Sequence, residues 1–339
     1  MKKALITGVT GQDGSYLSKY LLDLGYFVYG AIRRSSSPNK ERLNYFNLLE
    51  HERFKLIELD LTDSSSLYNF FSAYDVSEVY NLAAQSFVGL SFKQPLLTAN
   101  ITGLGPLYLL EAIRQTKKDI KFYQASSSEL FGKVHEVPQT EVTPFHPRSP
   151  YGVAKLFAHW SSINYRESYA MFTANGILFN HESPLRGVEF VTRKITTSVV
   201  KIKKNELDTL VLGNLDSLSD WGFAGDFVKM MHKMLQHDQP EDFVISTGIT
   251  TSVRDFAKMA FNAAEIDIVF EGTGIDEIGV NRTSGKKILS ISEEFYRPAE
   301  VDILHGSSEK AKKLLGWTPE TKVKDLVNMM IDHDIELSK

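Results

Sequence analysis

The 339-residue chain contains no cysteine, which excludes disulfide bridges, thiolate nucleophiles and cysteine-bound zinc. It has no excess of positive charge either, since 38 lysines and arginines stand against 42 acidic residues and the net charge is −4. Such a balance does not favour binding along a nucleic-acid backbone. No uninterrupted apolar run has membrane-spanning length, and the apolar start breaks at Gly8, too early for a signal sequence. We therefore expect a soluble, cytoplasmic protein with no nucleic-acid or membrane partner.

Short apolar runs alternate with helical patterns through the first half of the chain. The runs expected to form buried parallel strands are Ala4–Gly8, Phe27–Ile32, Phe54–Leu59, Val79–Ala83, Phe122–Ala125 and Ala174–Phe179. The helical patterns between them are Tyr16–Leu24, Ser65–Tyr74, Leu104–Arg114 and Tyr151–Tyr169. This alternation predicts right-handed βαβ units and hence an α/β fold with a Rossmann-type, doubly wound parallel sheet.

The second half of the chain has a looser pattern. Helices are expected over Phe190–Asn205, Gly222–Gln236, Ser252–Ala264, Lys310–Leu315 and Val323–Ile331, strands over Phe243–Ser246 and Ile268–Glu271, and a loop over Gly272–Lys287. We assign residues 1–180 to a cofactor-binding domain, to which the chain returns near 211–240 and 286–305. Residues 181–339 are assigned mainly to a smaller α/β lobe that binds the substrate.

A glycine-rich loop, Gly8-Val-Thr-Gly11-Gln-Asp-Gly14, lies between the first expected strand and its helix. In such loops the first glycine allows the tight turn, the second lets a diphosphate approach the backbone, and the third lets the helix pack on the strand. The helix N-terminus then presents free N–H groups and a positive dipole end to the anion. A plain glycine turn is the alternative, but the strand–loop–helix context favours dinucleotide binding.

The residues that follow the second expected strand distinguish the two nicotinamide cofactors. An acidic side chain there would hold the ribose 2′-hydroxyl of NAD, whereas this chain has Ile32-Arg33-Arg34-Ser35-Ser36. Guanidinium groups bind phosphate oxygens in two places, so we predict NADP, with a solvated basic loop as the alternative. Asp60 and Leu61, which end the third strand, would suit contacts to the adenine ring.

Tyr151 and Lys155, four residues apart in Tyr-Gly-Val-Ala-Lys, predict a reacting centre. A free tyrosine has a pKa of about 10 and is a poor base at neutral pH. Lys155 would lie one helical turn later on the same face, and its charge, with that of an oxidised nicotinamide, would lower the pKa of the phenol. Tyr151 would then take the proton of a sugar hydroxyl, with Ser127 hydrogen-bonded to the same oxygen. A helix-surface pair is the alternative.

Glu129 adds a carboxylate close to this tyrosine in the sequence. A simple dehydrogenase or epimerase has no need of it, whereas a dehydratase must remove a proton α to a new carbonyl before a hydroxyl group leaves. A partly buried glutamate with a raised pKa suits both that removal and protonation of the leaving hydroxyl. The alternative is a glutamate that satisfies backbone donors at a helix N-terminus.

The nine histidines of the chain are scattered. His232 and His237 are five residues apart and do not share a helix face, and no carboxylate cluster accompanies them. We interpret both as surface residues and expect no metal site.

Longer segments carry a likeness to a known family over nearly the whole chain. They are Ile6-Thr-Gly-Val-Thr-Gly-Gln-Asp-Gly-Ser-Tyr-Leu, Tyr80-Asn-Leu-Ala-Ala-Gln-Ser, Phe122-Tyr-Gln-Ala-Ser-Ser-Ser-Glu-Leu-Phe-Gly, Pro147-Arg-Ser-Pro-Tyr-Gly-Val-Ala-Lys, Asn175-Gly-Ile-Leu-Phe-Asn-His-Glu-Ser-Pro, Phe190-Val-Thr-Arg-Lys-Ile and Phe295-Tyr-Arg-Pro-Ala-Glu-Val-Asp. With these segments the chain resembles the GDP-mannose 4,6-dehydratase family of the extended short-chain dehydrogenase/reductase superfamily.

The resemblance implies a redox-neutral cycle on a GDP-sugar. Hydride would leave C4 of the hexose for NADP while Tyr151 takes the hydroxyl proton, and Glu129 would remove the C5 proton and help water leave C6. Hydride would then return to C6. The cofactor residues that it implies are Gly8, Thr10, Gly11, Gln12, Asp13, Gly14, Arg33, Asp60, Leu61, Leu82, Ala83, Ala84, Ser86, Tyr151, Lys155, His181 and Arg186. The substrate residues are Ser86, Asn180, Lys194, Arg297 and Glu300.

The family also implies a homo-oligomer, a dimer or a tetramer, because its Arg33–Pro38 loop reaches a neighbouring subunit. The chain departs from the family at two places. Ser127 stands where a threonine is usual; it keeps the hydroxyl group and loses the methyl group that restricts the rotamer, so we expect function to be retained. Ser219, Phe223 and Gly225 stand around Asp-Trp-Gly where the family usually has arginine and a second basic residue.

The second departure removes contacts to a diphosphate or sugar and leaves alternatives open. One is a 4,6-dehydratase that acts on a GDP-manno-heptose, and another is a nucleotide-sugar reductase or epimerase of the same fold. A third belongs to a different class, a catalytically silent NADP(H)-binding regulatory protein. That class has no need of Ser127, Glu129, Tyr151 and Lys155, so their presence favours an enzyme.

Overall fold

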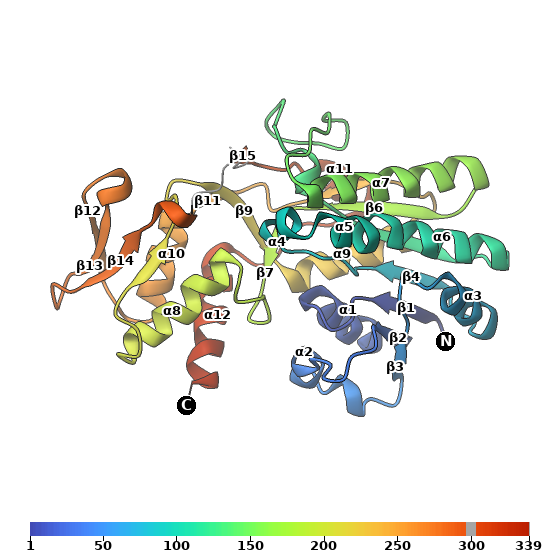
Figure 1. Cartoon of the computed structure of the whole chain (residues 1–339), viewed down its shortest axis with the longest axis horizontal. Helices are drawn as coiled ribbons and strands as arrows, with labels where there is room; N and C mark the ends of the chain where they lie inside the picture. Colours follow the sequence, from blue (N-terminus) through green and yellow to red (C-terminus); the bar gives the residue numbers. More distant parts are fainter. Residues whose placement is uncertain (296–302, 339) are drawn as a thin grey trace.

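A computed structural model of the chain describes residues 1–295 and 303–338. The larger lobe is built on a seven-stranded parallel sheet in the order β10-β6-β5-β4-β1-β2-β3 (Figure 1). Its strands are β1 (Lys3–Thr7), β2 (Phe27–Ile32), β3 (Phe54–Glu58), β4 (Glu78–Asn81), β5 (Lys121–Ser127), β6 (Thr173–Leu178) and β10 (Phe243–Ile245). This topology confirms the predicted Rossmann-type sheet.

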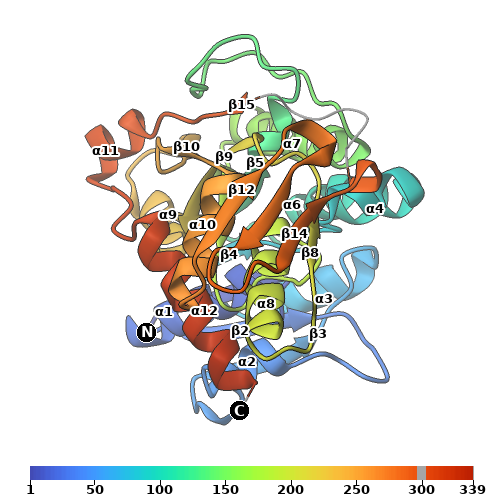
Figure 2. The ribbon, with the colours of Figure 1, turned by 90° about the vertical axis from the view of Figure 1, so that its left-hand side faces the viewer.

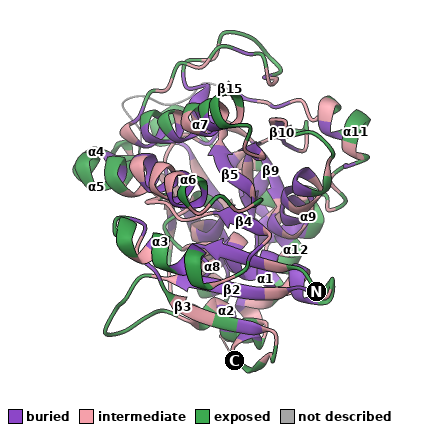
Figure 3. Cartoon of the chain, turned by 90° about the vertical axis from the view of Figure 1, so that its right-hand side faces the viewer, coloured by how far each residue is buried: buried purple, intermediate pink, exposed green. Residues whose placement is uncertain are grey.

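Alternate residues of the central strands pack against helices on the two faces of this sheet. On one face, Ala4 and Ile6 belong to a core that includes α1 (Gln12–Asp23) and α9 (Ala224–Gln236). On the other, Leu5 belongs to a core with α3 (Ser64–Ala73), α6 (Gly105–Thr116) and α7 (Pro150–Tyr169). Figure 3 shows the central strands almost wholly buried between these layers. Burial on both faces explains why the strands are continuous apolar runs.

The second lobe contains two small sheets, and Figure 2 shows the one with β8, β12 and β14 facing the viewer. The first has β7 (Asn180–Glu182), β9 (Leu218–Phe223), β11 (Thr250–Ser252) and β15 (Ile303–Leu304), and the second has β8 (Leu210–Leu212), β12 (Ile268–Glu271), β13 (Ile278–Asn281) and β14 (Lys287–Ile291). Helices α8 (Val191–Lys203), α10 (Val253–Ala263) and α12 (Val323–Leu337) share an apolar core with these strands.

Shorter helices complete the described chain. They are α2 (Glu41–Tyr45), α4 (Val88–Lys93), α5 (Pro95–Thr98), α11 (Glu309–Leu315), the 3₁₀ turns Leu48–Glu50, Ser128–Leu130, Gly274–Asp276 and Glu293–Phe295, and a π-helical stretch Ala99–Leu104. The turn Ser128–Leu130 follows β5 directly and carries Glu129.

The structure corrects two predictions for the second half. The expected loop 272–287 contains β13, which pairs with β12 and β14 in an antiparallel meander. Its four residues are too few to give a clear alternation, and pairing with neighbours decides its conformation. The chain does return to the large sheet, through α9 and β10. The described strands within 286–305 do not, because β14 pairs with β8 and β15 pairs with β9 in the second lobe.

One helical stretch in the described part of the chain, Pro95–Thr116, is long and apolar enough to cross a membrane by length and composition, although polar residues such as Asn100 and Glu111 interrupt it. Half of its most apolar window is buried inside the protein. Its α6 part packs against α3 and α7 and supplies Leu109 and Leu110 to the core. Packing within the lobe therefore explains the apolar character of the α6 part of this stretch.

A buried ion pair joins α8 to α12 in the second lobe. Arg193 Nη1 donates to Asp334 Oδ2 and, at 3.2 Å, to Thr196 Oγ1, and both charged side chains are buried. Removing one partner leaves the other charge buried and uncompensated. We expect Asp334→Ala to lower the free energy of unfolding by about 3 kcal/mol, measured by urea denaturation. Exposed Asp332→Ala on the same helix is the control, and equal stability of the two variants would contradict the argument.

Candidate active site

The glycine-rich loop has the geometry that its sequence predicts. Gly8 has a φ of +67°, and a Cβ built on it would lie 2.8 Å from the backbone N of Ala83. A Cβ on Gly14 would lie 2.5 Å from the carbonyl oxygen of Gly8, so the helix packs on the turn only because this side chain is absent. Helix α1 starts after Gly11 with its first N–H groups directed at the carboxyl edge of the sheet. The loop is therefore a cradle in which backbone can approach a diphosphate.

Two predicted cofactor residues hold this loop to the second lobe. His181 Nε2 lies 2.7 Å from Asp13 Oδ2, while its Nδ1 lies 2.7 Å from the carbonyl oxygen of Phe179. Burial alone would raise the pKa of Asp13, but attraction to and hydrogen bonding with His181 lower it on balance. The same pairing raises the pKa of His181 against the effect of burial. The ion pair fixes the start of α1 against β7.

The ends of the central strands are linked by buried side chains. Thr7 Oγ1 donates to Asn81 Oδ1 at 2.6 Å, and Asn81 Nδ2 donates to Gln124 Oε1 at 2.8 Å. Thr7 Oγ1 also accepts the backbone N–H groups of Leu82 and Ala83 at 3.2 Å. The predicted cofactor segment Leu82–Ala84 is thereby held beside the glycine loop.

Tyr151 and Lys155 lie on the first turns of α7, both buried. Ser149 caps this helix by accepting the N–H of Gly152 at 3.0 Å. Lys155 Nζ donates to the carbonyl oxygen of Ala125 on β5 at 2.7 Å and lies 5.8 Å from the centre of the Tyr151 ring. The lysine thus ties the helix to the strand that ends at Ser127.

A close backbone contact places Glu129 beside the tyrosine. A Cβ on Gly152 would lie 2.8 Å from the carbonyl oxygen of Glu129, so only glycine lets α7 approach the turn that carries this carboxylate. Ser127 Oγ accepts the N–H of Glu129 at 3.2 Å and caps that turn. Glu129 is half-buried. The hydroxyl group, the carboxylate and the phenol therefore come from adjacent backbone.

Burial raises the pKa of the Tyr151 phenol to about 12, and the charge of Glu129 acts in the same direction. Hydrogen bonding with Ser127 and the charge of Arg186 act the opposite way. Both carboxylate and guanidinium are thus close enough to act on the phenol. The chain's own groups therefore favour the neutral form of the Tyr151 phenol.

Burial also lowers the pKa of Lys155 to about 8, opposed by the charge of Asp13. The sequence predicted that Lys155 lowers the pKa of the Tyr151 phenol. For the chain's own groups this is wrong, because burial raises that pKa and Lys155 Nζ donates to the carbonyl oxygen of Ala125 instead. A positive charge brought to Tyr151 by an oxidised cofactor is the part of that prediction that still applies.

The remaining predicted cofactor residues lie around the same edge of the sheet. Arg33 is exposed after β2, and its neighbour Arg34 lies 3.8 Å from Glu58 of β3. Asp60 Oδ1 accepts two hydrogen bonds from Thr62, so its carboxylate shapes the turn after β3. Leu61 is buried and Ser86 is exposed.

Of the predicted substrate residues, Asn180 and Lys194 belong to the second lobe, whereas Ser86 follows β4 in the larger lobe. Asn180 starts β7 and pairs with Trp221 of β9. Lys194 Nζ lies 3.6 Å from the centre of the Phe295 ring, and Arg186 covers the ring of Phe190 at 3.5 Å. Burial lowers the pKa of Lys194, with Glu294 opposing this. Two further predicted substrate residues, Arg297 and Glu300, fall outside the described residues.

The positions that depart from the family have structural partners. Ser219 pairs with Thr251 and Leu304 in the small sheet. The ring of Phe223 meets the edge of Tyr16 of α1 at 5.5 Å, and a Cβ on Gly225 would lie 2.3 Å from that ring. Phe223 thus uses the space over Gly225 to join the second lobe to the cofactor helix.

Sequence reasoning missed several residues that hold the site. Arg42 donates to the carbonyl oxygens of Leu185 and Thr10, and Ser183 Oγ donates to Gln12 Oε1 at 2.7 Å. These bonds join segments far apart in the chain, so no local pattern identifies them. The surface interpretation of His232 is wrong, since this half-buried side chain hydrogen-bonds the hydroxyl group of Tyr26 at 3.0 Å. His237 is half-buried too.

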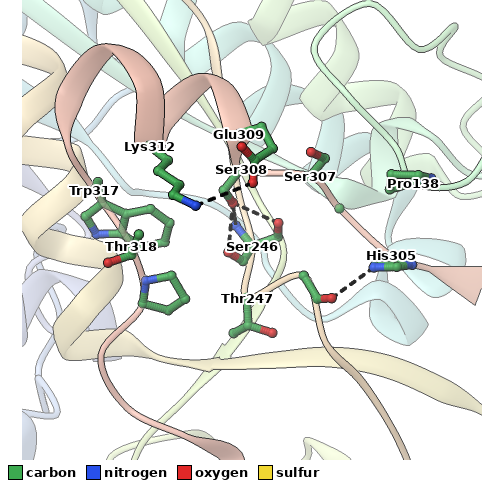
Figure 4. A pocket seen from close by; sticks show the side chains of 13 residues that line it. Pro138, Ser246, Thr247, His305, Ser307, Ser308, Glu309, Lys312, Trp317 and Thr318 are labelled. Carbon is green, nitrogen blue, oxygen red and sulfur yellow. Dashed lines mark hydrogen bonds and ion pairs between the residues drawn. The ribbon is translucent and has the colours of Figure 1, made fainter.

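A pocket of about 330 Å³ lies elsewhere, beyond the end of β10 (Figure 4). Ser246, His305 and Lys312 are among its lining residues, and none of the predicted site residues is. Two polar groups in it already bond within the chain: Ser308 Oγ donates to the carbonyl oxygen of Ser246 at 2.7 Å, and His305 Nε2 lies 3.0 Å from that of Gly248. We assign it no part in the candidate active site.

Comparison with known proteins identifies relatives over the whole chain. A family model described as GDP-mannose 4,6 dehydratase matches residues 5–330. The chain is 52% identical over 344 residues to GDP-mannose 4,6 dehydratase 2 of Caenorhabditis elegans, with 99% of this chain and 90% of that protein covered. It is 50% identical over 354 residues to GDP-mannose 4,6-dehydratase of Yersinia enterocolitica (100% and 95% covered) and 50% over 342 residues to the Homo sapiens protein of that name (99% and 92%).

Solved structures with the same fold are more distant in sequence. UDP-glucose 4-epimerase of Thermotoga maritima, solved with UDP-glucose, has a TM-score of 0.83 at 21% identity, with 99% of this chain and 100% of that chain covered. dTDP-glucose 4,6-dehydratase of Bacillus anthracis, solved with NAD, has a TM-score of 0.80 at 18% identity (98% and 96%). At these identities the likeness shows the fold alone.

Proposed function

The chain belongs to the GDP-mannose 4,6-dehydratase family, and from this premise we propose that it converts GDP-mannose to GDP-4-keto-6-deoxymannose with loss of water. The observation that supports this most directly is the close backbone contact between Glu129 and the helix of Tyr151. A carboxylate beside the phenol is what elimination needs beyond hydride transfer. We further propose that the seven-stranded lobe binds the cofactor, that the second lobe binds the GDP-sugar, and that the enzyme is a cytoplasmic homo-oligomer, a dimer or a tetramer.

We assign the chemical steps to the chain's own groups. Tyr151 takes the proton of the C4 hydroxyl, and Ser127 hydrogen-bonds the same oxygen as it becomes a carbonyl. Glu129 takes the acidified C5 proton and delivers a proton to the C6 hydroxyl, which leaves as water. Tyr151 finally returns its proton to C5. A bound nicotinamide cofactor would supply the capacity to accept a hydride from C4 and return it to C6.

The glycine loop fits a dinucleotide, since a Cβ on Gly8 or Gly14 would collide with the neighbouring backbone and the tight turn at the helix N-terminus could not form. We propose that the dinucleotide is NADP and that Arg33 binds its 2′-phosphate. The ion pair between Asp13 of α1 and His181 of β7 would then keep the glycine loop in place around the bound dinucleotide. Arg186, on the second lobe, is close enough to add positive charge near the phenol.

The choice of NADP gives a direct prediction for Arg33→Ala. Loss of a charge-assisted hydrogen bond should weaken NADP binding about tenfold to a hundredfold and leave NAD binding unchanged, as measured by calorimetric titration. Arg282→Ala, an exposed arginine of the second lobe, controls for the change in net charge. Equal losses for NADP and NAD would show that Arg33 does not bind the 2′-phosphate.

The activity itself is tested by incubating the purified protein with NADP and GDP-mannose and following the nucleotide sugar by mass. We expect loss of one water per sugar without net accumulation of NADPH, because the hydride returns to the product. GDP-manno-heptose in a parallel reaction decides the sugar, since the departures at Ser219, Phe223 and Gly225 bear on it. Bound nucleotide with no water loss from either sugar would refute the proposal and favour a silent binding protein.

A further inference from the structure

His159 is a buried histidine on the same face of α7 as the two predicted catalytic residues. It follows Tyr151 by eight residues and Lys155 by four, which places all three side chains in line along the helix. Its relative exposure is 2%. It takes no part in the proposed chemistry, and its ring packs edge-on against Phe145 at 5.2 Å. A buried imidazole in this position needs a polar partner.

That partner is on the strand that ends at the site. His159 Nδ1 lies 2.9 Å from Ser126 Oγ, and both groups are buried. One turn earlier, Lys155 Nζ donates to the carbonyl oxygen of Ala125. Successive turns of α7 are thus bonded to successive residues of β5, immediately before Ser127 and the turn that carries Glu129.

The environment keeps the imidazole neutral. Burial lowers the pKa of His159 to about 4, with Asp242 opposing this and Arg166 adding to it. Asp242 and Arg166 are themselves paired at 2.5 Å. One ring nitrogen of a neutral imidazole donates and the other accepts, so the bond to Ser126 forms in either tautomer.

We propose that His159 is a positioning residue that holds the end of β5, with Ser127 and Glu129, in register with Tyr151 and Lys155 on α7. The proposal rests on the proposed dehydratase function. Proton transfer needs donor and acceptor within hydrogen-bond reach, and a misplacement of about 1 Å can cost about a hundredfold in rate. Without the imidazole the buried Ser126 hydroxyl loses its partner, and the end of the strand is free to shift.

The test is a double-mutant cycle of Ser126→Ala, His159→Phe and the double variant. Phenylalanine keeps the ring and removes the hydrogen bond. We expect each single variant to lower kcat about tenfold to a hundredfold with KM unchanged, and the double variant to fall no further. His159→Asn, whose amide can occupy the place of Nδ1, should recover most of kcat. His232→Phe, which removes a similar bond to Tyr26 far from the site, is the matched control and should keep full turnover.

Hydrogen exchange of residues 121–130 gives a second readout that requires no substrate. We expect faster exchange at 126–130 in His159→Phe than in the His232→Phe control. Unchanged exchange there, or multiplicative effects of the two substitutions on kcat, would overturn the positioning role. If the dehydratase proposal itself is wrong, the unchanged protein will show no turnover. The hydrogen-exchange comparison requires no turnover and would still decide whether His159 positions the end of β5.

Discussion

Tyr151→Phe is expected to lower kcat by about 10³-fold or more, while NADP binding stays within a factor of about two. The ring keeps its packing in the buried site, and only the phenolic oxygen that we propose takes the C4 proton is lost. Tyr165→Phe on the same helix is the matched control, since its hydroxyl group bonds to Glu111 away from the site. The measurement is steady-state loss of water from GDP-mannose, with kcat and KM determined separately.

A change confined to KM would instead place Tyr151 in substrate binding. The pH dependence of kcat gives a further check, because burial raises the pKa of Tyr151 to about 12. If a cofactor's positive charge lowers that value, as we expect, the acid limb of the profile for kcat should lie well below pH 12 and should disappear in the phenylalanine variant.

Glu129→Gln is expected to abolish dehydration, with kcat for water loss lower by about 10³-fold or more. Glutamine has nearly the shape of glutamate but takes no proton from C5. Oxidation at C4 should survive, so a single turnover should accumulate NADPH that the unchanged enzyme would reoxidise. Glu136→Gln, at an exposed position in the loop after this turn, is the control. Absorbance at the nicotinamide band and the mass of the sugar report the two steps separately.

Full turnover of the Glu129→Gln variant would remove the reason for preferring a dehydratase over a reductase or epimerase of this fold. Loss of both the NADPH signal and water loss would also contradict the assignment, because it would place Glu129 in the first oxidation or in folding.

The large sheet was predictable because its strands are buried on both faces and its helices are amphipathic. Runs such as Phe27–Ile32 match the observed strand at both ends. The small sheets were not predictable in this way. Strand β7 has three residues and pairs with β9 some forty residues later, so its formation depends on tertiary contacts and leaves no local periodicity.

The candidate site shows the same division. The spacing of Tyr151 and Lys155 and the glycines of the first loop were evident from sequence, because each motif lies within one turn of its element. The bond between His159 and Ser126 joins residues 33 apart, and neither residue belongs to a local motif. The pKa of Tyr151 was predicted in the wrong direction for the chain's own groups, because burial is visible only once the fold is known.

Helix α9 and strand β10 reach the large sheet only after the chain has entered the second lobe. A fragment ending at residue 180 would leave β6 as an open edge and uncover the face that Phe227, Met230 and Met231 cover. Neither lobe can therefore be exchanged between homologues as one contiguous cassette. Changes of sugar specificity, in the laboratory or in evolution, have to come through individual side chains and loops grafted onto an undivided chain.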